Sequence, residues 1–482
     1  MLFNSLQFVL FFIVVTILYY VLEWRWRWKM LLAASCVFYM AFIPAYIFIL
    51  FTTISIDYVM GIMIARSAGR KRLVYLQISI VSTCLVLFVF KYCAFFGMTV
   101  RELQALLGAA QNFPITHIIL PIGLSFHTFQ SLSYVIEVYR GKQEPERNFG
   151  IYSLYVMFYP QLVAGPIERP QHLLHQLRED HRFELSNLSR GLYLITWGLF
   201  LKMVIADRSA VYVNAVYKNW ESQSGLSLLF ATLLFAVQIY ADFAGYSCIA
   251  IGCARIMGIK LMTNFNHPYF SNSFAEFWKR WHISLSTWFR DYVYIPLGGN
   301  RVSLSRHYVN LLLTFTISGL WHGANWTFVI WGAYNGVLLV CESHFRSFGW
   351  HYPRNMVGNI LRRAVVLACI CVGWIFFRAQ SLHAAIMIIS RIFTATSFSV
   401  WSFGNAMSSF AGDITSVAIG AITIFFVALM FAIEFAQESA LEKTRIAFHA
   451  SLKYQFAATV VLFEAIMLFG SFRSSAFVYF QF

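Results

Sequence analysis

The segment at residues 226–257, LSLLFATLLFAVQIYADFAGYSCIAIGCARIM, is an almost uninterrupted apolar run. A transmembrane helix needs about 20 apolar residues, so this run is long enough to cross a membrane. Asp242 lies near its centre, with Gln238 and Tyr246 four residues to either side and therefore on the same helix face. Because a carboxylate in contact with lipid is costly, we expect Asp242 to face other helices. Two roles stay open for it: a structural ion pair with an arginine, or a place in a substrate site.

The whole chain has the same apolar character. Of its 482 residues, 59% are hydrophobic and only 12% are charged, about half the ~25% of an average soluble domain. So much apolar surface does not fit inside a soluble protein, and it excludes an intrinsically disordered chain. The apolar runs are long, whereas an outer-membrane barrel shows short alternating segments. The sequence therefore predicts an all-α, polytopic membrane protein.

The length rule predicts about 11 to 13 transmembrane helices. The candidate spans are residues 2–22, 30–43, 45–64, 73–96, 115–138, 191–206, 226–257, 308–325, 326–341, 361–377, 414–435 and 456–472. Two further apolar segments are short: residues 151–164, which we expect to be re-entrant or half-buried, and residues 384–393. Re-entrant backbone is tolerated only where protein or water surrounds it.

The basic residues give the chain a formal net charge of +15. They lie in short clusters between apolar runs, which is typical of cytoplasmic loops and argues against a nucleic-acid partner. Such clusters follow the first, third and fifth spans, so we expect the N-terminus to lie outside the cytoplasm. The first run lacks a preceding basic region and a following cleavage site, so we expect a retained span and no signal peptide. The aromatic and basic residues 24–29 after it predict an interfacial belt.

The eight cysteines all lie in or beside apolar runs. Cys369 and Cys371 lack the spacing of a metal site, so we expect buried thiols and no metal centre.

The pattern changes between residues 272 and 310. Aromatic and aliphatic residues recur at helical spacing from Phe274 to Tyr292, which predicts one amphipathic helix in the membrane interface. Asn272 or Ser273 is expected to cap its start. An adjoining polar stripe is made of Lys279, His282, Ser286 and Arg290. From the pattern itself, this helix is either a simple anchor or part of a site.

His322 is expected at membrane depth. If residue 308 starts the next span at the cytoplasmic face, His322 lies about 21 Å along the helix at ~1.5 Å per residue. A histidine at this depth is either a neutral structural group or a functional one. A buried neutral imidazole can act as a general base on a hydroxyl that attacks an acyl carbon. Asn325 or a backbone N–H would then steady the oxyanion, and Trp321 adjoins the site.

Residues 277–301, FWKRWHISLSTWFRDYVYIPLGGNR, and 319–325, GLWHGAN, closely resemble the membrane-bound O-acyltransferase family, in particular its bacterial polysaccharide O-acetyltransferase branch. Further stretches of that branch are AGPIERP at 164–170, YADFAGYS at 240–247 and the closing YFQF at 479–482. The resemblance implies a ring of helices around a central lumen. It also implies that His322 is the family's essential histidine and His282 its second one.

The resemblance further implies an acetyl group moved from a cytoplasmic thioester, acetyl-CoA or an acylated carrier, with no bound cofactor. The acceptor is an exported polysaccharide or a periplasmic relay protein resembling an acetyltransferase or esterase, which places the chain in a bacterial inner membrane. Basic groups are expected to hold donor phosphates or, equally well, lipid headgroups: Lys279, Arg280, Arg290 and Arg301. Gln130, near His127 on the fifth span, either lines the lumen or bonds neighbouring helices.

We expect a single membrane domain over residues 1–482, with N-terminal helices in 1–110, a catalytic core in 111–380 and C-terminal helices in 381–482. Two other functions stay open. A transporter or flippase would use intramembrane histidine and aspartate residues as proton relays, although the sequence lacks the internal repeat of many transporters. A scaffold of a polysaccharide export complex would leave the acyl chemistry to a partner.

Overall fold

The computed structural model describes residues 1–109, 113, 118–348, 355–394, 414–439, 451–472 and 477–478. Throughout this described part of the chain the regular elements are helices, with no strand. Seven helical stretches in it are long and apolar enough to cross a membrane: Tyr46–Arg66, Arg70–Leu106, Leu185–Lys218, Gly225–Ile256, Met356–Arg378, Gly420–Ser439 and Leu452–Phe469. The expected all-α, multi-pass class is confirmed.

Several other predicted spans form helices that are shorter or less apolar. They are α1 (Leu6–Val21), α2 (Trp24–Met40), α6 (Leu124–Tyr139), α14 (Leu304–His322) and α15 (Trp326–Ser347). The count of 11 to 13 spans and the ring around a lumen therefore stay predictions, as do the three domain limits. The closing stretch 479–482 lies outside the described residues.

The chain divides into two compact units, of which the first comprises Met1–Ile195 and Ile249–Met262. Besides α1, α2 and α6 it holds α3 (Tyr46–Arg66), α4 (Arg70–Leu87), η1 (Phe88–Tyr92), α5 (Cys93–Leu106), α7 (Phe149–Met157), α8 (Pro170–Leu173), η2 (Gln176–Arg178) and the first part of α9 (Leu185–Phe200). Residues 151–164 begin within α7, continue as turns and are buried throughout. Protein therefore surrounds the turns of this segment, as a re-entrant backbone requires, and its re-entry into the membrane stays a prediction.

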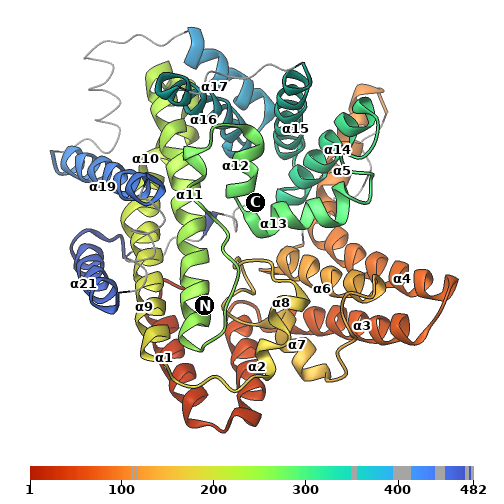
Figure 1. Cartoon of the computed structure of the whole chain (residues 1–482). Helices are drawn as coiled ribbons and strands as arrows, with labels where there is room; N and C mark the ends of the chain where they lie inside the picture. Colours follow the sequence, from red (N-terminus) through yellow and green to blue (C-terminus); the bar gives the residue numbers. More distant parts are fainter. Residues whose placement is uncertain are drawn as a thin grey trace. The chain divides into compact units, whose positions relative to one another are not determined.

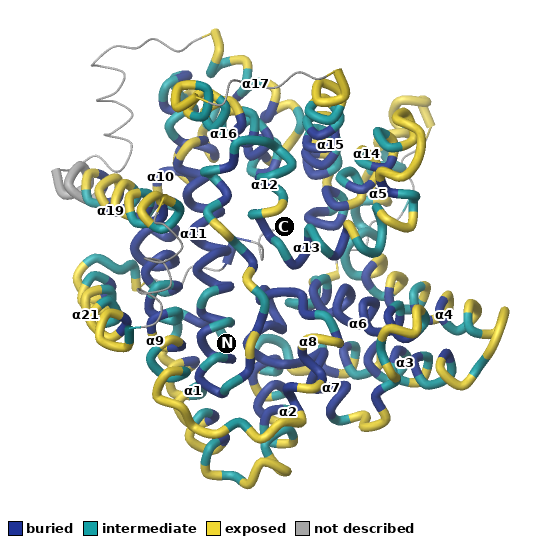
Figure 2. Tube along the Cα trace, in the orientation of Figure 1, coloured by how far each residue is buried: buried dark blue, intermediate teal, exposed yellow. Residues whose placement is uncertain are grey.

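The second unit comprises Thr196–Cys248 and Thr263–Phe482. It holds η3 (Leu201–Ala206), α10 (Asp207–Lys218), η4 (Trp220–Ser222), most of α11 (Gly225–Ile256), η5 (Pro268–Phe270), α12 (Phe274–Arg280), α13 (Ile283–Phe289), η6 (Arg290–Tyr294), α14, α15, α16 (Met356–Arg378), α17 (Leu382–Thr394), α19 (Ile414–Ser439) and α21 (Leu452–Phe469). Figure 1 shows these helices, and Figure 2 shows α11 dark along most of its length because it is buried. The largest fully buried side chains of this unit include Trp281, Trp331 and Trp374.

The antiparallel helices α14 and α15 pack backbone to backbone. A Cβ atom on Gly319 would overlap the carbonyl oxygen of Phe328, and one on Gly332 would overlap that of Phe315. Small residues at these positions let two helices approach closely. This packing fixes the end of α14, where His322 lies.

The expectation of one continuous amphipathic helix from Phe274 to Tyr292 is wrong. The chain forms α12, leaves helical geometry at Trp281 and His282, and resumes as α13. At the break, the backbone of Asn264 accepts from Ile283 N at 2.9 Å, so a distant loop replaces the missing helical hydrogen bonds. The start was predicted correctly, because the Ser273 hydroxyl caps α12 by accepting from Glu276 N.

Candidate active site

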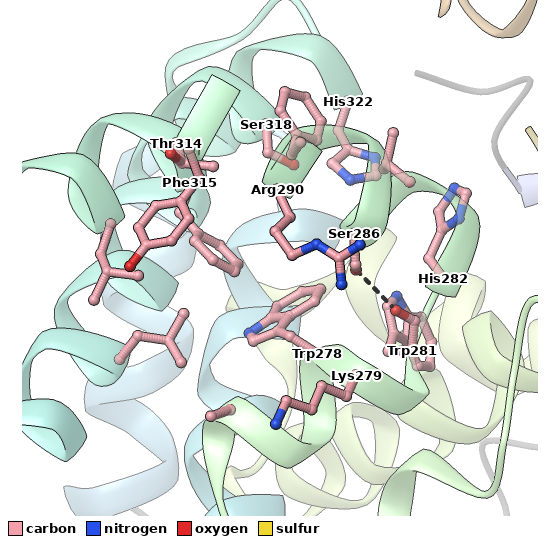
Figure 3. A pocket seen from close by; sticks show the side chains of 16 residues that line it. Trp278, Lys279, Trp281, His282, Ser286, Arg290, Thr314, Phe315, Ser318 and His322 are labelled. Carbon is pink, nitrogen blue, oxygen red and sulfur yellow. Dashed lines mark hydrogen bonds between the residues drawn. The ribbon is translucent and has the colours of Figure 1, made fainter. Parts of the chain in front are cut away.

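A cavity of about 230 Å³ lies within the second unit. Its lining comes from α12, the turn after it, α13, η6, α14 and one residue of α15. The lining residues are Ala275, Trp278, Lys279, Trp281, His282, Leu285, Ser286, Phe289, Arg290, Tyr294, Leu311, Thr314, Phe315, Ser318, His322 and Leu339. Figure 3 shows the side chains of His322, His282 and Arg290 around this cavity. The two histidines, 40 positions apart in the sequence, thus share one cavity.

His322 is the last residue of α14 and is 6% exposed. Aromatic rings surround its imidazole: Trp321 at 4.9 Å, Trp331 at 5.0 Å and Phe377 at 5.5 Å between ring centroids. Gly323 follows directly and leaves no room for a side chain beside the Phe328 ring. The imidazole is therefore held in an apolar wall and opens onto the cavity, as a general base requires.

His282 lies in the turn between α12 and α13 and adopts the left-handed conformation, with φ 43°. Its Nδ1 atom is 3.1 Å from Asn264 Oδ1. The same oxygen accepts from the Ser284 backbone N–H at 3.2 Å, while the Asn264 amide donates to Ser247 Oγ. Because a backbone N–H can only donate, this atom of Asn264 is the carbonyl oxygen, and His282 Nδ1 must carry the proton.

When the His282 imidazole is neutral, its lone pair is therefore on Nε2. Burial lowers the pKa of His282 to about 3, because the charged form is poorly solvated there. The Phe243 ring lies perpendicular to it at 4.5 Å. His282 can accept or relay a proton, but it carries no charge near neutral pH.

Two of the four predicted basic residues lie at the cavity. Lys279 and Arg290 line it and are exposed, and Arg290 Nε also pairs with Asp291 at 2.8 Å. Arg280 instead forms ion pairs with two carboxylates, at 2.7 and 2.8 Å. Arg301 is exposed and is absent from the lining.

The other tentative site residues lie away from the cavity wall. Asn325 caps α15, with its Oδ1 accepting from Thr327 N at 3.0 Å, and it is exposed. Trp321 contacts the His322 ring from outside the lining. Gln130 belongs to the first unit, where it donates to the Tyr155 carbonyl oxygen at 2.6 Å.

The Asp242 carboxylate is engaged in an ion pair and a hydrogen bond within the protein, away from the cavity. Lys202 Nζ lies 2.7 Å from Asp242 Oδ1, and Oδ2 of the same carboxylate accepts from Val478 N at 2.6 Å. The expected ion pair is therefore present, with a lysine in place of the anticipated arginine.

Two residues of the site escaped the sequence analysis. Asn264, which fixes His282, lies in an irregular loop and gives no local signal. Ser318 lines the cavity one helical turn before His322, and its position four residues earlier on the same helix was a usable signal.

Comparison with known proteins finds one matching family model and several similar acyltransferases. The model of MBOAT, the membrane-bound O-acyltransferase family, matches residues 147–353, which include both cavity histidines. The chain is 37% identical over 436 residues to the probable alginate O-acetylase AlgI of Pseudomonas aeruginosa, covering 89% of this chain and 81% of that protein. It is 32% identical over 412 residues to the peptidoglycan O-acetyltransferase of Helicobacter pylori, covering 79% and 76%. It is 28% identical over 286 residues to the teichoic acid D-alanyltransferase of Bacillus subtilis, covering 56% and 72%.

Proposed function

Since the chain belongs to the membrane-bound O-acyltransferase family and is a multi-pass membrane acyltransferase, we propose that it moves an acetyl group from a cytoplasmic thioester to a hydroxyl on the other side of the membrane. The observation that carries this proposal is the single cavity that His282 and His322 share with two cationic side chains. Relatives that act on alginate and peptidoglycan support acetyl as the transferred group.

His322 is the general base of the proposed reaction. It takes the proton of the acceptor hydroxyl while the hydroxyl oxygen attacks the thioester carbonyl carbon. The carbon–sulfur bond then breaks, and the proton passes to the departing thiolate. Neutral His282, with its Nε2 lone pair, assists by orienting the acceptor or relaying the proton. Both groups have to be neutral before the reaction, and the lowered pKa of His282 favours that state for this residue.

Lys279 and Arg290 hold the phosphate groups of the donor, either acetyl-CoA or an acylated carrier. Both side chains are exposed at the cavity, where a cation can meet a phosphate without a large desolvation cost. Arg280, which is absent from the cavity lining and is paired with two carboxylates, is not assigned to this role. The donor is consumed as a substrate, and the proposal needs no bound cofactor.

The acceptor is an exported polysaccharide or a periplasmic relay protein that passes the acetyl group on. With such an acceptor, the proposed location of the chain is the inner membrane of a bacterium. An acetyl-transfer assay separates the parts of the proposal. The purified protein in liposomes receives acetyl-labelled thioester, and label is followed in added alginate, in other polysaccharides and in co-purified proteins.

We expect thioester loss that depends on an acceptor. A Lys279→Met, Arg290→Met double variant should raise KM for the donor at least tenfold with a smaller change in kcat, because it removes ground-state contacts. Arg301→Met, outside the cavity lining, is the matched control. Absence of acetyl transfer with every donor and acceptor would contradict the proposed function.

A further inference from the structure

Ser318 presents a hydroxyl to the cavity that is unlike the others there. Four residues of the lining carry hydroxyl groups, and three of these groups are engaged within the protein. Their hydrogen bonds are Ser286 Oγ to Trp281 O at 3.1 Å, Thr314 Oγ1 to Asn310 O at 2.6 Å, and Tyr294 Oη with His307 Nδ1 at 2.9 Å. Within the described residues no hydrogen bond engages the Ser318 hydroxyl.

The lack of a hydrogen bond from the Ser318 hydroxyl to any described residue is unusual for a serine within a helix. Serine in a helix commonly bonds the carbonyl four residues earlier, as Thr314 does with Asn310. Ser318 is 7% exposed and lines the cavity, and Figure 3 shows its side chain directed into that space. A buried hydroxyl that forgoes its local acceptor can donate to a substrate atom.

The separation between Ser318 and the proposed base His322 allows both to act on one reacting carbon atom. Ser318 and His322 lie four residues apart on one face of α14, which corresponds to about 6 Å along the axis. A base reaches the attacking hydroxyl at about 3 Å, and an oxyanion donor reaches the carbonyl oxygen at about 3 Å. Because both side chains line the same cavity, one tetrahedral carbon in it can lie near both of them.

We propose that Ser318 donates a hydrogen bond to the acyl carbonyl oxygen as that oxygen gains negative charge. This inference rests on the proposed function and replaces the earlier assignment of Asn325 to that role. The acceptor oxygen–carbon bond forms, His322 receives the acceptor's proton, and the thiolate leaves and takes that proton. Ser318 keeps its own proton and stabilises the charged intermediate throughout.

The test compares kcat and KM for three variants in the labelled acetyl-transfer assay. Ser318→Ala should lower kcat by about 10- to 100-fold and change KM less than about twofold, because the contact strengthens only in the transition state. Ser318→Cys, which keeps the side-chain shape, should fall similarly since a thiol is a weak donor. Thr316→Ala removes a hydroxyl of the same helix outside the cavity and is the control.

The outcomes are distinguishable. If Ser318→Ala does not fold, Ser318→Cys decides the question. A kcat within twofold of wild type in the folded Ser318 variants overturns this inference, while loss of transfer in His322→Ala leaves the proposed function standing. Mass spectrometry that finds an acetyl ester on Ser318 also overturns it, because the serine is then a nucleophile. A wild-type protein without any acyl transfer overturns both proposals.

Discussion

Removal of the Asn264 side chain should destabilise the turn that carries His282. Its Oδ1 atom accepts from His282 Nδ1, from Ser284 N and from Ser284 Oγ, and its amide donates to Ser247 Oγ. Asn264→Ala leaves two buried N–H donors without an acceptor, and each such group costs about 1–3 kcal/mol. Allowing for partial relaxation, we expect a loss of about 2–4 kcal/mol in the free energy of unfolding.

Thermal unfolding in detergent measures this effect. At about 1 °C per kcal/mol for a chain of 482 residues, the melting temperature of Asn264→Ala should fall by roughly 2–4 °C. Asn335→Ala is the matched control, since Asn335 is similarly buried and, among the described residues, its side chain makes one hydrogen bond, to the Trp331 carbonyl oxygen at 2.8 Å. If Asn264→Ala unfolds no earlier than this control and retains full turnover, the reasoning about the turn is refuted.

Asn264→Asp separates positioning from stability. The carboxylate keeps the acceptor for His282, so the fold should survive, but its charge raises the pKa of His282 from about 3 toward neutrality. Because a protonated His282 has no lone pair, kcat should gain an acid limb between about pH 5 and 7, with activity rising as pH increases. A pH–rate profile identical to wild type would show that His282 does not take part in proton transfer.

The remaining predictions concern packing, buried charge and pH. Gly319→Ala should separate α14 from α15 and reduce kcat at least tenfold in the acetyl-transfer assay, whereas Gly373→Ala, whose Cβ would lie 3.4 Å from its nearest neighbour, should be tolerated. Lys202→Met leaves buried carboxylates without their cation and should cost about 3–5 kcal/mol, measured by thermal unfolding. The Glu168 carboxylate raises the pKa of His172 above 6.5, so this contact stabilises the protein below pH 6.5 and fades as pH rises through the raised pKa. The melting temperature of His172→Gln should therefore fall further below wild type at pH 5.5 than at pH 8.5.

The polar stripe shows what periodicity can predict. Lys279, His282, Ser286 and Arg290 were assigned to one helix face, and all four line the cavity. The helix itself is broken within the stripe. Spacings of three and four residues place side chains on one face of a helix over a few turns. Side chains of the two short helices α12 and α13 still point into the same cavity, although the helix is interrupted between them.

Residue pairs that are distant in the sequence could not be predicted from local sequence patterns. Asn264 lies 18 positions before His282 and Lys202 lies 40 positions before Asp242, so periodicity carries no information about either pair. Asn325 had a competing local explanation, because asparagine before a helix is a preferred N-cap. The structure shows that this local role uses its side-chain oxygen.

The acetyl-transfer rate of His322→Ala tests the central claim most directly. It is measured in liposomes with labelled thioester, alongside wild type and Thr316→Ala, after each protein is shown to fold and to bind the donor. The account predicts that kcat falls by at least about 100-fold while donor binding is retained, because general-base catalysis contributes about 10²–10⁴. A His322→Ala protein that transfers acetyl groups at the wild-type rate would contradict it.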